Sequence, residues 1–132
     1  MSQKNLELVQ AAFAAYYRGD EPALLDLVAV DVAIAQFPEQ VDMHDYCGHE
    51  GFRQVLSDWI GSWDDWTIEI LGARELGDLV LVTARQRGRG KASGVPMDTE
   101  AIFLFTVRGG LIARWQMFST EARALESAGL AQ

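Results

Sequence analysis

The sequence predicts a single α+β domain over residues 1–132, in which a curved, mixed or antiparallel sheet packs against three N-terminal helices. Apolar residues recur at helical spacing in the first half of the chain, and they alternate with polar residues along strand-like runs in the second half. Helices therefore come early and a meander of strands comes late, which is the order of an α+β fold rather than of repeated βαβ units. A short C-terminal helix, which Ser119 or Thr120 can cap, completes the domain.

Three helices are predicted before the meander. Apolar residues at helical spacing predict the first from about Asn5 to Arg18, and Gly19 suits the left-handed position after its end. Asp20 can cap a short second helix, which tolerates Pro22 in its first turn. The most regular helical spacing in the chain predicts the third helix from about Glu50 to Ser62.

The predicted sheet begins between the second and third helices. A β-rich stretch runs from Val32 to Phe37, and a polar loop, Glu39–Gly48, leads from it into the third helix. Turn signals such as Gly109-Gly110 separate the strands of the meander. The four predicted strands of this meander are Trp66–Leu71, Leu79–Arg87, Met97–Val107 and Leu111–Phe118.

The composition is that of an ordinary globular protein, with 49% hydrophobic and 23% charged residues. The formal net charge of −8 argues against nucleic acids and anionic membranes as partners, because phosphate surfaces are bound by clusters of Lys and Arg. The apolar runs are too short to cross a bilayer, and the N-terminus lacks the apolar core of a signal peptide. Cys47 is the only cysteine, so no intrachain disulfide can form. We therefore expect a cytoplasmic protein that binds neither nucleic acid nor membrane.

The chain contains four distinctive segments: Arg18-Gly19-Asp20, Tyr46-x-Gly48-x-x-Gly51, Val107–Ile112 and Ala124–Leu130. Together they resemble the nuclear-transport-factor-like superfamily, and within it most closely the SnoaL-like branch, named for polyketide cyclases. The resemblance covers about residues 5–130 and implies a cone-shaped fold whose bent sheet and helices enclose one deep cavity. It does not imply one reaction, because this fold hosts isomerases, cyclases, epoxide hydrolases and non-catalytic modules.

Most catalytic groups of these enzymes are missing from the corresponding positions. Ketosteroid isomerases place a base carboxylate at the end of the first strand, where this chain has Gln36, and their two oxyanion donors fall on Ala12 and Phe103. The acid that epoxide hydrolases and cyclases carry on the last strand corresponds to Met117. The arginine-x-aspartate pair of the epoxide hydrolases resembles the segment at Arg85, with a second arginine in place of the acid. An amide is not a useful base and a phenyl ring cannot donate to an enolate, so none of these chemistries carries over intact.

The phase of the predicted strands indicates which side chains face the cavity. They form a mostly apolar lining with few polar groups, which suits a hydrophobic or aromatic small molecule. The alternative is that these side chains only fill the interior, since Met and aromatic residues belong to cores more often than to pockets. The predicted lining is Tyr16, Gln36, Thr99, Ala101, Phe103, Phe105, Trp115 and Met117.

Basic residues alternate from Arg85 to Lys91, so in a strand they share one face. Such a face can hold a carboxylate or a phosphate, because arginine offers a bidentate donor. Pairing across the hairpin with Asp98 and Glu100 is the interpretation we favour, with Arg85 as the exception nearest the core.

Five residues that can bind metals crowd the loop before the third helix: Asp42, His44, Asp45, Cys47 and His49. Their spacing matches no familiar closed zinc pattern, and we predict a lid over the cavity with no metal or other cofactor. An imidazole at His49 could lie over the entrance and act as a base.

Two functional hypotheses follow. The first is a protein that binds a small hydrophobic molecule, in its more specific form an isomerase, cyclase or hydrolase. In that form Gln36 would position water or a carbonyl, Tyr16 and Arg85 would donate hydrogen bonds, and His49 would be the base. The second is a non-catalytic ligand-binding or dimerisation module that lacks the catalytic acids of the family.

The resemblance also implies a homodimer formed through the outer face of the sheet. The apolar residues Ile102 and Leu104 lie on that second face in the predicted strand phase. Trp59 belongs to the core face of the third helix, whereas Trp63 and Trp66 could cover the cavity entrance or contact a second subunit.

Overall fold

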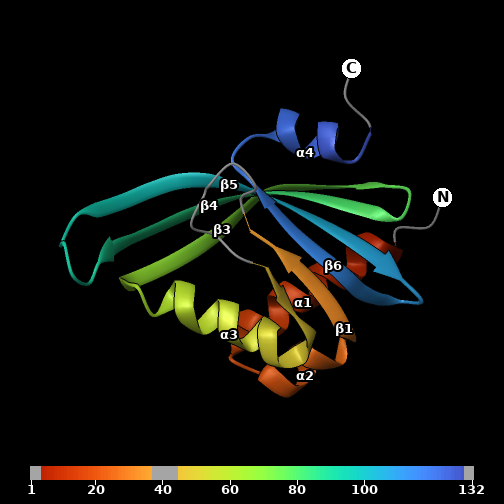
Figure 1. The fold of residues 1–132 in the computed structure, drawn as a ribbon, viewed down its shortest axis with the longest axis horizontal. Coiled ribbons are helices and arrows are strands. Elements are labelled where there is room, and N and C mark those ends of the chain that lie inside the picture. Colours follow the sequence, from red (N-terminus) through yellow and green to blue (C-terminus); the bar gives the residue numbers. More distant parts are fainter. Residues whose placement is uncertain (1–3, 37–44, 130–132) are drawn as a thin grey trace.

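The computed structural model describes residues 4–36 and 45–129 (Figure 1). Its six strands form one sheet in the order β2-β1-β6-β5-β4-β3. Strand β1 runs parallel to β6, and every other neighbouring pair is antiparallel. The elements are α1 (Lys4–Arg18), α2 (Glu21–Asp26), β1 (Val28–Ala35), β2 (Tyr46–Cys47), α3 (Gly48–Ile60), β3 (Trp63–Leu76), β4 (Leu79–Gly90), β5 (Pro96–Arg108), β6 (Leu111–Phe118) and α4 (Glu121–Ser127).

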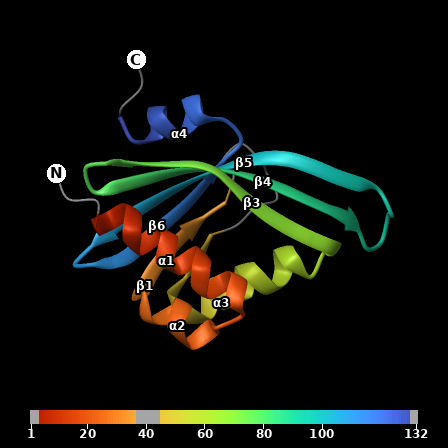
Figure 2. The same cartoon turned by 180° about the vertical axis from the view of Figure 1, so that it is seen from behind.

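The sheet is strongly bent, and helices lie on both of its sides. Helices α1, α2 and α3 lie on the inner side, and α4 lies on the outer side (Figures 1 and 2). Register shifts interrupt β3 against β4 between Ile70 and Gly72, and β5 against β6 between Thr106 and Val107. Such bulges bend a strand and increase its twist, which lets the long strands curve around the inner helices.

Local sequence explains the ends of several helices. The Asp20 side chain accepts a hydrogen bond from the Ala23 amide at 3.2 Å and caps α2. Thr120 caps α4 in the same way, accepting from the Arg123 amide at 3.2 Å. Gly19 has a φ of +71°, the left-handed conformation expected after α1. None of the described helices is long and apolar enough to cross a membrane.

Two separate apolar cores hold the domain together. The larger fills the space between the inner sheet face and α1, α2 and α3. The smaller lies on the outer face, where side chains of β4, β5 and β6 pack under α4. It contains Ile102 and Leu104, which are only 4% and 1% exposed. These two residues therefore do not form an open apolar face, because α4 of the same chain covers them.

The sheet is larger than the sequence indicates. Strand β1 begins at Val28, four residues before the predicted stretch, and β3 extends from Trp63 to Leu76. The short strand β2 pairs Tyr46 and Cys47 with β1 inside the segment expected to be a loop. Two residues cannot show an alternation of apolar and polar side chains, so the sequence carries no signal for β2.

Candidate functional site

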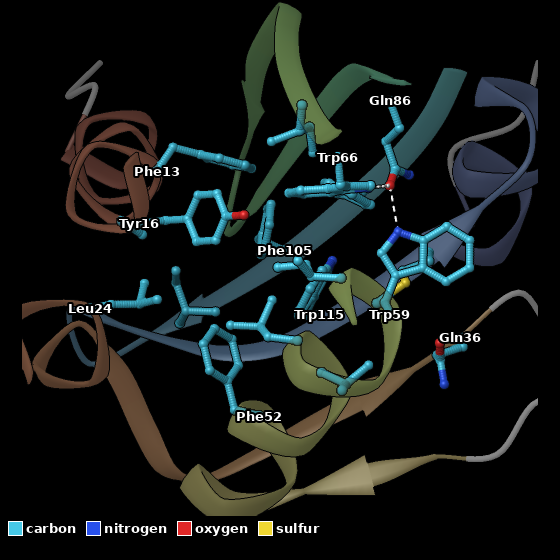
Figure 3. Close-up of a pocket in the computed structure, with 18 residues that line it drawn as sticks. Phe13, Tyr16, Leu24, Gln36, Phe52, Trp59, Trp66, Gln86, Phe105 and Trp115 are labelled. Carbon is cyan, nitrogen blue, oxygen red and sulfur yellow. Dashed lines mark hydrogen bonds between the residues drawn. The ribbon is translucent and has the colours of Figure 1, made fainter. Parts of the chain in front are cut away.

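A cavity of about 90 Å³ lies between the inner sheet face and the first three helices (Figure 3). By the measure in which one water needs about 10–15 Å³, it has room for roughly six to nine non-hydrogen atoms. Its wall is almost entirely apolar, and eight of its 18 described lining residues are aromatic. The aromatic lining residues are Phe13, Tyr16, Phe52, Trp59, Trp66, Phe103, Phe105 and Trp115.

The floor of the cavity is built by the period-two alternation of β5 and β6. Phe103 lies directly opposite Met117 in the antiparallel register, and Phe105 lies opposite Trp115. All four side chains face inward and line the cavity. The rings of Phe103 and Trp115 meet edge to face with centroids 5.4 Å apart, and those of Phe105 and Trp115 stack at 6.0 Å. The floor is thus a rigid aromatic surface.

The opposite wall comes from α1 and α3. Helical spacing places Phe13 and Tyr16 of α1, and Phe52, Leu56 and Trp59 of α3, along the faces turned toward the sheet. The Tyr16 hydroxyl points from α1 into the cavity (Figure 3). Burial, with a smaller contribution from the neighbouring Tyr17, raises the pKa of Tyr16 above its ordinary value. Tyr16 therefore remains a protonated hydrogen-bond donor at neutral pH.

Gln86 is the most deeply buried polar side chain in the described part of the protein, with 4% of its surface exposed. Its Oε1 accepts hydrogen bonds from Trp59 Nε1 at 2.6 Å and from Trp66 Nε1 at 3.1 Å (Figure 3). An indole nitrogen can only donate, so these two contacts identify the amide oxygen and fix the orientation of the side chain. We call these three residues the Gln86 clamp.

The strand phase contained a signal for Gln86 that the sequence analysis missed. Val80, Val82 and Ala84 of β4 are fully buried, and the same alternation carries Gln86 to the inner face. A polar residue that continues a buried phase needs a hydrogen-bond partner, and the two tryptophans provide it.

The residues predicted to line the cavity divide into two groups. Gln36 and Tyr16 contribute to the wall, as do the four side chains of the floor. Ala101 is buried in the inner core but is not part of the lining, and Thr99 is exposed. Thr99 has the inward phase, but it lies on the β4–β5 hairpin, which extends beyond the described helices (Figure 1).

The three residues predicted to be catalytic do not come together. Gln36 lines the cavity and forms a hydrogen bond with Tyr46, outside the lining. His49, at the start of α3, uses Nε2 for a 2.8 Å hydrogen bond with the Val28 carbonyl. Arg85 lies on the outer face of β4, since Gln86 next to it points inward. Neither His49 nor Arg85 is part of the described lining.

Arg85 was expected to be the exception on the basic face, but it forms a cross-strand pair like the one favoured for the rest of that face. Its Nε and Nη2 donate to the two carboxylate oxygens of Asp98, both at 2.8 Å. The hydrogen bond from Arg85 holds the pKa of Asp98 below its ordinary value. This bidentate pair leaves Arg85 occupied at the surface and away from the cavity.

The described lining contains one titratable side chain, Tyr16, and no carboxylate, imidazole or cationic group. No group of three or more His, Cys, Asp or Glu side chains in the described ranges is placed to hold a metal. Asp42 and His44, named above as potential ligands, lie outside the described residues.

A larger, more open hollow of about 460 Å³ adjoins the cavity on the side of α2 and α3. The ion pair between Glu21 and Arg53, at 2.9 Å, links the two helices there. The side chains that line both spaces form the partition between them: Tyr16, Leu24, Phe52, Leu56 and Ile60.

Comparisons with known proteins agree with this architecture. The family model described as a SnoaL-like domain matches residues 9–115. Among curated proteins, none matches the chain. An NTF2-like protein from Burkholderia thailandensis has a similar structure, with a TM-score of 0.79, 20% identity and coverage of 100% of this chain and 99% of the other.

Two further solved structures are similar. One is a candidate SnoaL-like polyketide cyclase from Jannaschia, with a TM-score of 0.76, 19% identity and coverage of 98% and 94%. The other is TerC co-crystallised with polyporic acid, with a TM-score of 0.74, 20% identity and coverage of 93% and 96%. Identities this low speak for the shared fold and not for a shared reaction. The chain therefore belongs to the SnoaL-like domain family and has the α+β, NTF2-like fold.

Proposed function

We propose that this protein binds a small, neutral, hydrophobic or aromatic molecule in the cavity between the sheet and the first three helices. The observation that carries the proposal is the lining itself, an almost continuous aromatic and aliphatic wall around about 90 Å³. An apolar cavity of this kind is poorly hydrated, so an apolar ligand enters without displacing well-bound water. The co-crystallisation of TerC with polyporic acid supports the proposal, because a protein of the same fold accepts a small molecule.

Entry through the partition toward the outer hollow fits this function. The partition consists of side chains on α1, α2 and α3, and none of the described strands contributes to it. Leu24 and Leu56 can change rotamer without breaking a backbone hydrogen bond, so a ligand can pass between them. The hollow would then be the vestibule of the cavity.

We favour a protein that binds its ligand without catalysis, in which the lining transfers no proton. An isomerase, cyclase or hydrolase of this family type would need a base within hydrogen-bond reach of the substrate. The described lining offers donors and no base, and His49 is directed to a backbone carbonyl. Turnover of a bound ketone or epoxide that His49→Gln abolishes would support the enzyme instead.

A homodimer remains our proposal on the strength of the family resemblance alone, since α4 covers the outer apolar residues Ile102 and Leu104. Light scattering at micromolar concentration tests it, and a monomer would remove it.

A reducing, cytoplasmic environment suits Cys47, which is exposed and unpaired.

The binding proposal is tested by filling the cavity. Ala12 lines it and is 6% exposed, so Ala12→Leu places three further carbon atoms in the space. Ethylbenzene, with eight non-hydrogen atoms, should bind to the wild-type protein in calorimetry and lose most of its affinity for this variant.

Ala14→Leu is the matched control, because Ala14 is on the same helix but exposed. It should leave binding unchanged. If ethylbenzene and larger apolar probes fail to bind the wild-type protein, or if both variants bind as well as it does, the cavity is only packing space.

A further inference from the structure

The wall of the apolar cavity includes the ring of Trp115, whose buried indole N–H has no acceptor among the described residues. Trp115 is 8% exposed and lines the floor, and its Nε1 is buried with no hydrogen-bond partner among the described residues. Its neighbours are aromatic, with the rings of Phe52, Phe103 and Phe105 centred 5.6, 5.4 and 6.0 Å from its own. An indole N–H in such surroundings loses its hydrogen bond to water and regains nothing of equal strength.

The Gln86 clamp presents a second donor. A carbonyl oxygen has two acceptor sites, and the indoles of Trp59 and Trp66 occupy both sites of Gln86 Oε1. The amide NH₂ group is what remains available, and it forms no hydrogen bond with the described residues. Without the clamp Gln86 could rotate and offer either end, but the clamp leaves it only as a donor.

Tyr16 adds a hydroxyl from the opposite wall. It faces the cavity, packs edge to face against Trp66 with ring centroids 6.0 Å apart, and forms no hydrogen bond with described residues. The polar groups available at the cavity wall are therefore mainly N–H and O–H donors that lack an acceptor among the described residues. The described wall holds no cation that would compensate a buried anion.

We propose that the cavity selects neutral, ring-sized molecules that carry an acceptor oxygen, such as a ketone or quinone carbonyl, and that Trp115 Nε1 is the recognising donor, assisted by Gln86 and Tyr16. The inference rests on the proposed binding function and names the chemical class of its ligand. A carbonyl satisfies the buried donor and brings no hydrogen of its own. A hydrocarbon leaves the donor unsatisfied, an alcohol must also place its own proton, and a carboxylate brings an uncompensated charge into an apolar space.

Four probes of nearly equal size, with eight or nine non-hydrogen atoms, separate these alternatives: acetophenone, 1-phenylethanol, ethylbenzene and benzoate. Acetophenone should bind about tenfold more tightly than ethylbenzene, the ratio expected when one buried donor gains its acceptor. The alcohol should lie between them, and benzoate should bind most weakly. Calorimetry or a thermal-shift titration gives this order directly.

Trp115→Phe removes the N–H and keeps an aromatic ring. It should reduce the preference for acetophenone over ethylbenzene to less than about twofold, because neither probe can then form a hydrogen bond with the cavity floor. Trp63→Phe is the matched control. Trp63 has the other buried indole N–H without a described partner, but it does not line the cavity, so this variant should keep the full preference.

A spectroscopic measurement on the wild-type protein covers the case in which Trp115→Phe fails to fold. The chain has four tryptophans, so its ¹⁵N spectrum contains four indole N–H signals, which single Trp→Phe variants assign. Acetophenone should move the Trp115 indole proton downfield, and ethylbenzene should not.

The outcomes distinguish this inference from the function on which it rests. Equal binding of acetophenone and ethylbenzene, or no downfield shift at Trp115, overturns the inference and leaves hydrophobic binding intact. Tightest binding of benzoate overturns it in favour of anion recognition. Binding by none of the four overturns both.

Discussion

Replacing Gln86 by leucine tests the reasoning about the clamp most severely. Leucine is close to glutamine in size, so the change removes the acceptor of Trp59 Nε1 and Trp66 Nε1 without opening a large cavity. A buried donor left without a partner costs about 1–3 kcal/mol. Because Trp66 is only half-buried and water can reach part of it, we expect Gln86→Leu to lower the free energy of unfolding by about 2–4 kcal/mol.

Equilibrium unfolding in urea measures this loss as a shift in the midpoint at constant slope. Gln10→Leu is the control, since Gln10 is exposed on α1 and should change stability by less than about 0.5 kcal/mol. The loss of stability in the double variant Gln86→Leu/Trp59→Phe should be about 1–2 kcal/mol smaller than the sum of the losses in the two single variants. The reason is that Trp59→Phe removes one of the donors that Gln86→Leu leaves without an acceptor. Gln86→Leu with wild-type stability, or strict additivity in the double variant, would refute the account of the clamp.

Three further predictions concern the surface. Asp98→Asn should leave ligand affinity unchanged and should lower stability only above pH 3.8. The loss should vanish as the pH falls through the lowered pKa of Asp98, because protonation then breaks the pair with Arg85 in the wild type as well. Unfolding measured against pH checks this, and a loss of stability that persists in acid would contradict it. Thr120→Ala should lower the free energy of unfolding in urea by about 1 kcal/mol, because it removes the cap of α4. Thr120→Ser keeps the hydroxyl and is the control, so an equal loss in both variants would count against the cap. Arg53→Ala should cost less than about 1 kcal/mol, because both partners of its pair with Glu21 are more than half exposed, and a larger loss in the same assay would show that the pair is more than a surface contact.

The floor of the cavity follows from the sequence because it depends on one local rule. Alternation along β5 and β6 places Phe103, Phe105, Trp115 and Met117 on one face, and the hairpin turn fixes their register. Helical spacing does the same for Tyr16 on α1. Each of these assignments needs only the period of its own element.

The other features depend on tertiary contacts that a period does not encode. Alternation assigns Thr99 and Ile102 to faces of the sheet, but it does not show that the hairpin outgrows the helices or that α4 covers the outer side. The Gln86 clamp needs Trp59 of α3 and Trp66 of β3 to meet at one oxygen, although these residues are far from Gln86 in the sequence. The phase of β4 places Gln86 inside, but only the fold supplies its partners.

The central claim is that the space between the sheet and the first three helices is a binding site and not merely loose packing. A crystal structure with iodobenzene tests it directly, because iodine is located by its anomalous signal and the molecule fits a space of about 90 Å³. The account predicts one strong anomalous peak inside the cavity, within van der Waals contact of Phe103 and Trp115. No peak, or a peak only in the open hollow between α2 and α3, would contradict it.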